Sequence, residues 1–121
     1  MKITKHRKEI ISIFESNNTK LFNAEDIFNI IGENKIDLST IYRNVNALYD
    51  NSKLEKCIID GTAYFYLSTN EHNHIAVCKK CHSFVFVGCL LHGALKEYEN
   101  LQTFKVTEHD LTIYGICSSC A

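Results

Sequence analysis

The chain has 121 residues, of which 45% are apolar and 22% are charged, and its formal net charge at pH 7 is −1. This length allows one ordinary domain or two small ones, and no apolar stretch approaches the 18 residues expected of a membrane-spanning helix. The charge is unevenly distributed, because both arginines and nine of the 13 basic residues lie in residues 1–68. If the protein binds nucleic acid, we expect this half to do so.

Two helices are predicted at the start of the chain. The first covers Thr4 to Ser16, and its apolar positions fall on one face. These positions are Ile3, Ile10, Ile11 and Phe14. The second begins at Asn23, which forms a capping-box pattern with Asp26, and ends at Gly32.

A third helix is predicted after a cap at Asp37, and its outer face sets it apart. Its inward positions are apolar: Leu38, Ile41, Val45 and Leu48. Its outward positions are Ser39, Arg43, Asn46 and Ala47, with Thr40 and Tyr42 on the flanks. This outer face is small and polar, carries one arginine and contains neither Glu nor Lys. A surface that lies against base edges and phosphates needs such a composition.

A hairpin follows the three helices. Two short strands, Leu54 to Ile59 and Ala63 to Leu67, flank the dipeptide Asp60-Gly61, which favours a type I′ turn. Three helices and a hairpin in this order are typical of a winged helix-turn-helix domain, in which the third helix enters the major groove. We assign residues 1–68 to this domain and the polar residues 69–73 to a linker.

Residues 74–121 predict a small α/β domain, so that the whole chain belongs to the α+β class. The predicted strands are His74 to Cys78, Ser83 to Val87, Phe104 to Glu108 and Leu111 to Ile116. A helix is marked by Leu91, Ala94, Leu95 and Tyr98. A three-stranded sheet with one helix is too thin to be stable alone, so we expect this domain to pair with a second copy of the chain.

Two Cys-x-x-Cys pairs, Cys78/Cys81 and Cys117/Cys120, are typical of a closed tetrahedral zinc site. The 35 residues between the pairs exceed the spacing of a simple zinc ribbon, so the metal would close a small domain. Two disulfides, or a redox-active pair, are the alternatives. However, Met1 is followed by a charged stretch without an apolar signal region, which favours a cytoplasmic protein with a structural zinc.

In its order of features the chain resembles the ferric uptake regulator (Fur) family of metal-dependent bacterial repressors. The matching segments are Ala24-Glu25-Asp26-Ile27, Leu38-Ser39-Thr40-Ile41-Tyr42-Arg43-Asn44, His72 through Cys81, Phe104-Lys105-Val106 to His109, and Tyr114-Gly115-Ile116-Cys117 with Cys120. The resemblance implies a homodimer on a palindromic DNA operator, a structural zinc on the four cysteines and a second, regulatory metal. It also implies DNA contacts by Tyr42 and Arg43. The candidate DNA-binding residues are therefore Ser39, Thr40, Tyr42, Arg43 and Asn46.

The regulatory metal site departs from the family pattern. Iron- and peroxide-sensing members carry a His before the second helix and an acidic residue at the end of the wing, where this chain has Leu21 or Phe22, and Tyr66. The ligands implied instead belong to the family's other site, inside the dimerisation domain. They are His72, His74 and His109, with His92 slightly favoured over Cys89 as the fourth. We expect His6, His82 and Cys57 to have no metal-binding role.

Imidazole-rich ligation suits zinc better than iron or manganese, so we expect zinc sensing, with iron or peroxide sensing as the alternative. A zinc enzyme such as a nucleobase deaminase would need a His-x-Glu motif and a Pro-Cys-x-x-Cys motif. The chain reads Glu71-His72-Asn73-His74 and contains no proline, which favours a regulator over an enzyme. We expect the metal to favour a closed arrangement of the two domains in which the recognition helices meet successive major grooves.

Overall fold

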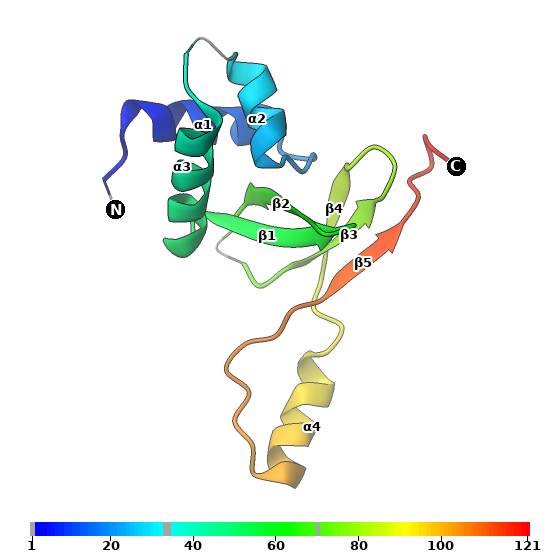
Figure 1. Cartoon of the computed structure of the whole chain (residues 1–121). Coiled ribbons are helices and arrows are strands. Elements are labelled where there is room, and N and C mark those ends of the chain that lie inside the picture. Colours follow the sequence, from blue (N-terminus) through cyan, green and yellow to red (C-terminus); the bar gives the residue numbers. More distant parts are fainter. Residues whose placement is uncertain (1, 33–34, 70) are drawn as a thin grey trace.

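The computed structural model describes residues 2–32, 35–69 and 71–121, apart from the side chains of His92, Leu101 and Gln102. Helices and strands follow in the order α1 (Lys5–Ser16), α2 (Ala24–Ile31), α3 (Leu38–Asp50), β1 (Leu54–Ile59), β2 (Thr62–Leu67), β3 (His74–Cys78), β4 (Phe84–Val87), α4 (His92–Gln102) and β5 (Thr112–Gly115). The three N-terminal helices and the β1–β2 hairpin form one lobe. The strands β3, β4 and β5 form a second lobe, and α4 stands away from both (Figure 1).

Each of the three N-terminal helices begins at a side-chain cap. Thr4 Oγ1 accepts a hydrogen bond from the first turn of α1. Asn23 and Asp26 form the predicted capping box, with hydrogen bonds of 2.7 and 3.0 Å. Asp37 caps α3 by accepting from Thr40 N at 2.7 Å. These bonds satisfy N–H groups that the helix leaves unpaired, so the local sequence alone determines where α2 and α3 start.

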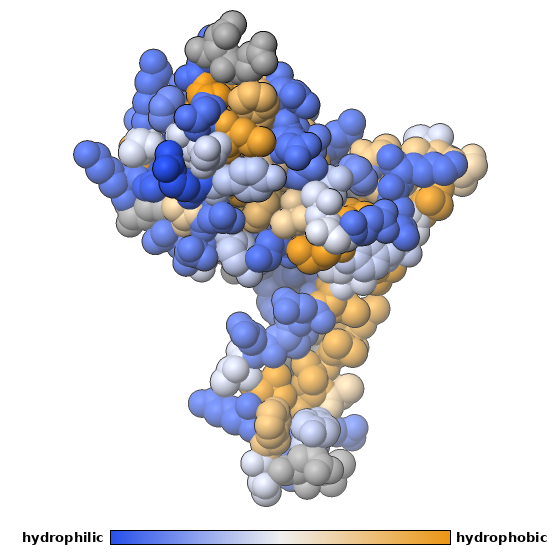
Figure 2. Space-filling model, viewed as in Figure 1, coloured by the Kyte–Doolittle hydropathy of each residue, from blue (hydrophilic) through white to orange (hydrophobic). Residues whose placement is uncertain are grey.

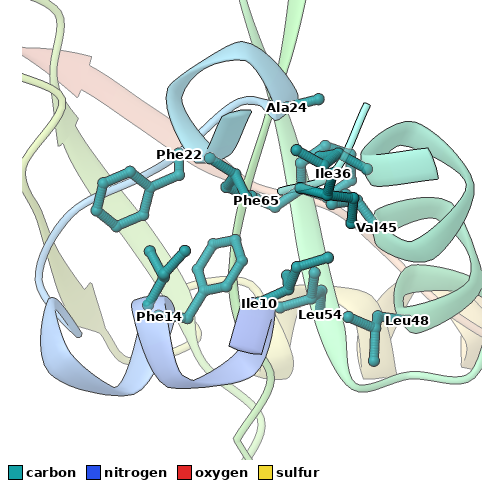
Figure 3. Packing of buried hydrophobic residues seen from close by; sticks show 12 residues of the cluster. Ile10, Phe14, Phe22, Ala24, Ile36, Val45, Leu48, Leu54 and Phe65 are labelled. Atoms are coloured by element: carbon teal, nitrogen blue, oxygen red, sulfur yellow. The ribbon is translucent and has the colours of Figure 1, made fainter. Parts of the chain in front are cut away.

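The core of the N-terminal lobe lies between the helices and the hairpin (Figure 3). Its buried members are Ile10, Ile13, Phe14, Phe22, Ala24, Ile27, Ile36, Ile41, Val45, Leu48, Leu54 and Phe65. Phe14 meets Phe22 edge to face, with ring centroids 5.6 Å apart. The prediction that Ile3 lies on this face was wrong: α1 starts only at Lys5, so Ile3 precedes the helix and is 38% exposed.

The hairpin β1–β2 is buried on both faces. Leu54 of β1 and Phe65 of β2 belong to the helical core. Cys57 and Ile59, on the other face of β1 from Leu54, belong to a second buried cluster. Alternate residues of a strand lie on opposite faces, which explains the division. The turn between the strands has positive φ at both Asp60 (49°) and Gly61 (82°), as the predicted type I′ turn requires.

The second lobe is a three-stranded sheet in the order β4-β3-β5. The central strand β3 is antiparallel to β4 and parallel to β5, with Ile75 opposite Thr112 and Cys78 opposite Gly115. The predicted strand at residues 104–108 was wrong, because this segment is irregular. It returns from α4 toward the sheet, and among the described residues no strand lies beside it to pair with.

The two lobes are joined by apolar packing and by backbone hydrogen bonds. The second cluster contains Leu21, Cys57, Ile59, Ile75, Val77 and Phe84, with Tyr64 and Tyr66 packed against it. Leu21 N donates to the carbonyl of His82 at 2.9 Å, and Phe84 N donates to the carbonyl of Thr19 at 2.8 Å. The lobes therefore share a continuous interface, which extends beyond the linker.

Helix α4 and the irregular segment after it form an arm, residues 88–111, that projects from the sheet (Figure 1). Apolar surface gathers along this arm (Figure 2), where Leu90, Tyr98 and Phe104 are 74%, 49% and 57% exposed. Among the described residues, no helix is long and apolar enough to cross a membrane.

We expect Gly61→Ala to lower the free energy of unfolding by about 1 kcal/mol, because a Cβ disfavours the left-handed backbone at φ +82°. Urea denaturation at fixed protein concentration measures this change. Gly88→Ala is the matched control, since the space around both glycines is open but Gly88 has no positive φ. Equal losses in the two variants would contradict a backbone origin.

Candidate metal centres and DNA-contacting helix

The four cysteines of the two Cys-x-x-Cys pairs meet at one end of the sheet. Cys78 ends β3, Cys81 lies in the turn before β4, and Cys117 and Cys120 follow β5. Their four sulfur atoms lie within 4.8 Å of one another, and Cys81 Sγ is 3.8 Å from Cys117 Sγ. All six cysteines of the chain are free thiols, so the pairs are not disulfides.

The surroundings of these thiols favour ionisation at two positions. Backbone N–H groups of Cys117 and Cys81 lower the pKa of Cys78 to about 6. The Ser83 hydroxyl, 2.9 Å from Cys81 Sγ, lowers the pKa of Cys81. The neighbouring sulfur of Cys117 raises the pKa of Cys120 to about 12. A negative charge on one sulfur disfavours ionisation of its neighbours, and a cation at the centre of the cluster would stabilise several thiolates together.

The sulfur geometry fits zinc. Zn–S bonds of about 2.3 Å place tetrahedral ligands about 3.8 Å apart, which equals the separation of Cys81 and Cys117. The four thiols use all four positions of a tetrahedral ion, so no position is left for a substrate or water. This arrangement suits a structural site better than a catalytic one.

A second cluster lies at the opposite end of β3. His74 begins the strand and His72 lies two residues before it, while Cys89 follows β4 and His109 precedes β5. Their nearest ligand atoms all lie within 4.8 Å of one another. His109 Nε2 is 3.1 Å from Nε2 of His72, 3.1 Å from Nε2 of His74 and 3.3 Å from Cys89 Sγ.

Hydrogen bonding alone does not explain this convergence. A neutral imidazole nitrogen offers either one N–H or one lone pair, so His109 Nε2 can complete only one of its close contacts. Zn–N bonds of about 2.0–2.1 Å would place tetrahedral nitrogens about 3.3 to 3.4 Å apart, close to the separations of His109 from His72 and His74. One metal ion would satisfy all four side chains together.

Burial favours the neutral, metal-binding form of the His74 imidazole. His74 is 5% exposed, and burial, followed by the charges of His72 and His109, lowers its pKa. The neutral form, which binds metals, is therefore favoured at pH 7. The three histidines also line a cleft of about 480 Å³ beside the hairpin, through which an ion can reach them.

Of the described candidate ligands, Cys89 joins the three histidines. The structure brings Cys89 to the three histidines, whereas the side chain of the favoured candidate His92 lies outside the described residues. At the positions where iron-sensing relatives have ligands, Leu21 is buried and Tyr66 packs against Phe84 at 5.2 Å between ring centroids. Cys57 is also buried, which raises its pKa to about 11. Within the described part of the chain, only the two clusters above can hold a metal in this way.

The predicted DNA-contacting face of α3 is open to solvent. Ser39, Tyr42, Arg43 and Asn46 are exposed, whereas Thr40 is half-buried. Arg43 Nη2 donates to Thr40 Oγ1 at 3.0 Å, which holds the guanidinium against the start of the helix. Sequence analysis missed one nearby residue: Arg7 of α1 donates to Asn44 Oδ1 at 3.0 Å and ties α1 to α3. The signal was available, since Arg7 is one of only two arginines.

Comparison with known proteins agrees with these features. The model of the ferric uptake regulator family matches residues 1–114. A ferric uptake regulation protein from Staphylococcus aureus is 32% identical over 123 residues, covering 99% of this chain and 88% of that protein. The solved ferric uptake regulator from Francisella tularensis with iron has a TM-score of 0.79 at 23% identity, with coverage of 99% and 94%.

A solved zinc uptake regulator complexed with zinc and DNA has a TM-score of 0.75 at 16% identity and covers 99% of this chain and 83% of its own. At such identities the solved structures show the fold, and the family model and the relative from Staphylococcus aureus show the ancestry. The winged-helix arrangement fits the fold of these solved structures. The chain is a member of the ferric uptake regulator family, whose proteins are metal-dependent, DNA-binding transcription regulators.

Proposed function

We propose that this family member is a zinc-responsive repressor that acts on metal homeostasis genes as a homodimer bound to a palindromic operator. The observation that carries the proposal is the pair of separate ligand clusters on one sheet, one of four thiols and one of three imidazoles and a thiol. The first suits a permanent metal and the second a reversible one. We further propose that the protein works in the cytoplasm, with a DNA-binding domain at residues 1–68, a linker at 69–73 and a dimerisation domain at 74–121.

The cysteine cluster holds the structural zinc in this proposal. Its ligands come from both ends of the C-terminal lobe's sequence, because 35 residues separate Cys81 from Cys117. A metal here crosslinks the ends of β3 and β5 and supplies folding energy that so small a sheet lacks. When bound, the zinc would neutralise the negative charge of the thiolates. Its four coordination positions would all be occupied by sulfur.

The cluster of His72, His74, Cys89 and His109 holds the regulatory metal. Its ligands include no carboxylate, and borderline nitrogen and soft sulfur donors select zinc over manganese or ferrous iron. The fold itself does not decide the metal, since its solved relatives include a ferric uptake regulator with iron and a zinc-bound manganese uptake regulator. The ligands of this chain are therefore the basis for proposing zinc.

Exposed apolar surface supports the homodimer. Val85 on β4, Ile113 on β5 and Tyr98 on α4 are 62%, 39% and 49% exposed. A thin sheet with an apolar surface gains stability when a second copy covers it. A symmetric dimer would present two copies of α3 to two half-sites of a palindrome.

Arg43→Ala should weaken binding to an operator selected from random-sequence DNA by about 5- to 150-fold, because the variant loses a contact to a base or phosphate. Fluorescence anisotropy at matched salt and saturating zinc measures this loss. Lys96→Ala is the control for net charge, since Lys96 is an exposed residue of α4. Equal affinities of Arg43→Ala and the parent protein would show that another face of the lobe binds DNA.

Cys120→Ser should remove one zinc per chain, unfold the sheet lobe and abolish the dimer, because three thiolates cannot close the structural site. Metal analysis, circular dichroism and sedimentation measure these three effects. Cys57→Ala, which alters a buried thiol outside both clusters, should keep the zinc and the dimer. A dimeric Cys120→Ser protein without this zinc would contradict the structural assignment.

His74→Ala should keep the structural zinc and the dimer but lose the metal-dependent gain in operator affinity. Chelator-treated protein that retains the structural zinc is loaded in turn with zinc, ferrous iron and manganese, and operator binding is measured for each. His82→Asn is the control, because Asn tolerates the positive φ of that residue (61°). A stronger response of the parent protein to iron or manganese than to zinc would show that zinc is not the effector.

A further inference from the structure

We propose that Tyr114 couples the regulatory metal to the wing, the hairpin β1–β2, through the hydrogen bond that its hydroxyl group donates to the backbone of β1. Tyr114 is a positioning residue, since it is not among the ligands. The inference rests on the proposed function, because it assumes that the regulatory cluster of His72, His74, Cys89 and His109 binds the metal. It assigns a specific contact to the expected metal-dependent approach of the two lobes.

The regulatory cluster holds the chain immediately before β5. His109 lies three residues before Thr112, the first residue of the strand, and its Nε2 atom is 3.1 Å from Nε2 of His74. The ring of His74 also hydrogen-bonds to the backbone of Leu111. A metal ion bound to His74 and His109 would therefore fix residues 109–111 against the start of β3.

The strand β5 carries this restraint to Tyr114. It runs parallel to β3, with Thr112 opposite Ile75 and Tyr114 opposite Val77. It is also an edge strand, with β3 as its strand neighbour among the described residues. Ligands at its start and pairing with β3 along its length therefore set the position of the Tyr114 side chain relative to the sheet.

The hydroxyl group of Tyr114 reaches the wing. Tyr114 Oη donates to the carbonyl of Ile58 in β1 at 2.9 Å. The wing and the recognition helix α3 form one unit, because Leu54 of β1 packs in the same buried core as Val45 and Leu48 of α3. The hydrogen bond therefore connects β5 to the lobe that carries the DNA-contacting face.

The bond lies at a cleft and can open without disturbing a core. Tyr114 and Ile58 are 45% and 50% exposed, and both line the cleft of about 480 Å³ that His72, His74 and His109 also line. Water competes for an exposed donor and acceptor, so the bond adds little stability by itself and its population depends on how β5 and β1 are aligned. A metal that favours the aligned arrangement shifts the population toward the bonded state.

The size of the coupling follows from the strength of such a bond. A neutral hydrogen bond that forms in only one arrangement favours that arrangement by about two- to tenfold in each chain. In the proposed homodimer two copies of the bond act together. Tyr114 would then account for about 4- to 100-fold of the zinc-dependent gain in operator affinity.

Tyr114→Phe in the full-length protein, with the structural zinc in place, tests this inference. The variant keeps the ring, so we expect it to remain a dimer and to bind the second zinc, while its zinc-dependent gain in operator affinity falls by about 4- to 100-fold. Fluorescence anisotropy measures operator binding, and competition with a chelating dye measures zinc binding. Tyr98→Phe is the control, because it removes a tyrosine hydroxyl from α4 and keeps the ring that packs against Phe104. Its gain should equal that of the parent protein.

Reciprocity separates coupling from a loss of stability. If zinc and DNA favour the same arrangement, operator DNA raises the affinity for the second zinc by the same factor by which zinc raises operator affinity. Both factors should fall together in Tyr114→Phe, whereas a variant that is only less stable would keep them. A fall of less than fourfold in the gain, or loss of the second zinc from the variant, would overturn the inference.

A second measurement uses the parent sequence. Labelling with fluorotyrosine and comparison with Tyr114→Phe identify the fluorine resonance of Tyr114, and the second zinc should shift it in the parent protein but not in His74→Ala. An unchanged resonance in the parent protein would overturn the inference.

The two proposals fail in different ways. If the second zinc binds and raises operator affinity in the parent protein while Tyr114→Phe keeps the gain, the inference fails and the proposed function stands. If no second zinc binds, or if zinc leaves operator affinity unchanged, both fail.

Discussion

The central strand β3 is the constraint on which both metal clusters depend. It carries His74 at its first position and Cys78 at its last, so its five residues separate the clusters by about 13 Å. Its parallel pairing with β5, Ile75 opposite Thr112 and Cys78 opposite Gly115, brings His109 to one end and Cys117 to the other. A slip of this register would disturb the two clusters together.

The structure assigns different work to different interactions. Apolar packing joins the lobes. Four thiols meet at one end of the sheet, and three histidines and Cys89 meet at the other end. The thiol cluster and the imidazole cluster therefore lie at separate places on one sheet. Among the described residues, α4 has no substantial packing against another helix or strand.

Local chemistry made much of the fold predictable. The caps at Asn23 and Asp37 and the turn at Asp60-Gly61 each depend on a few neighbouring residues, and each was predicted correctly from the sequence. The position of Cys89 beside the three histidines was not predictable, because it depends on the path of the chain after β4. The segment 104–108 alternates like a strand, yet pairing requires a partner that sequence alternation cannot reveal.

The turn between Cys78 and Ser83 has a second role besides placing thiols. The carbonyl of His82 accepts a hydrogen bond from Leu21 N, and Phe84 N donates to the carbonyl of Thr19. Backbone groups of the N-terminal lobe therefore find hydrogen-bond partners in the sheet lobe. A fragment cut at the polar linker would expose these backbone groups to water and uncover Leu21, Cys57 and Ile59. Residues 69–73 therefore mark a change in composition, while backbone hydrogen bonds between residues 19–21 and 82–84 join the two lobes.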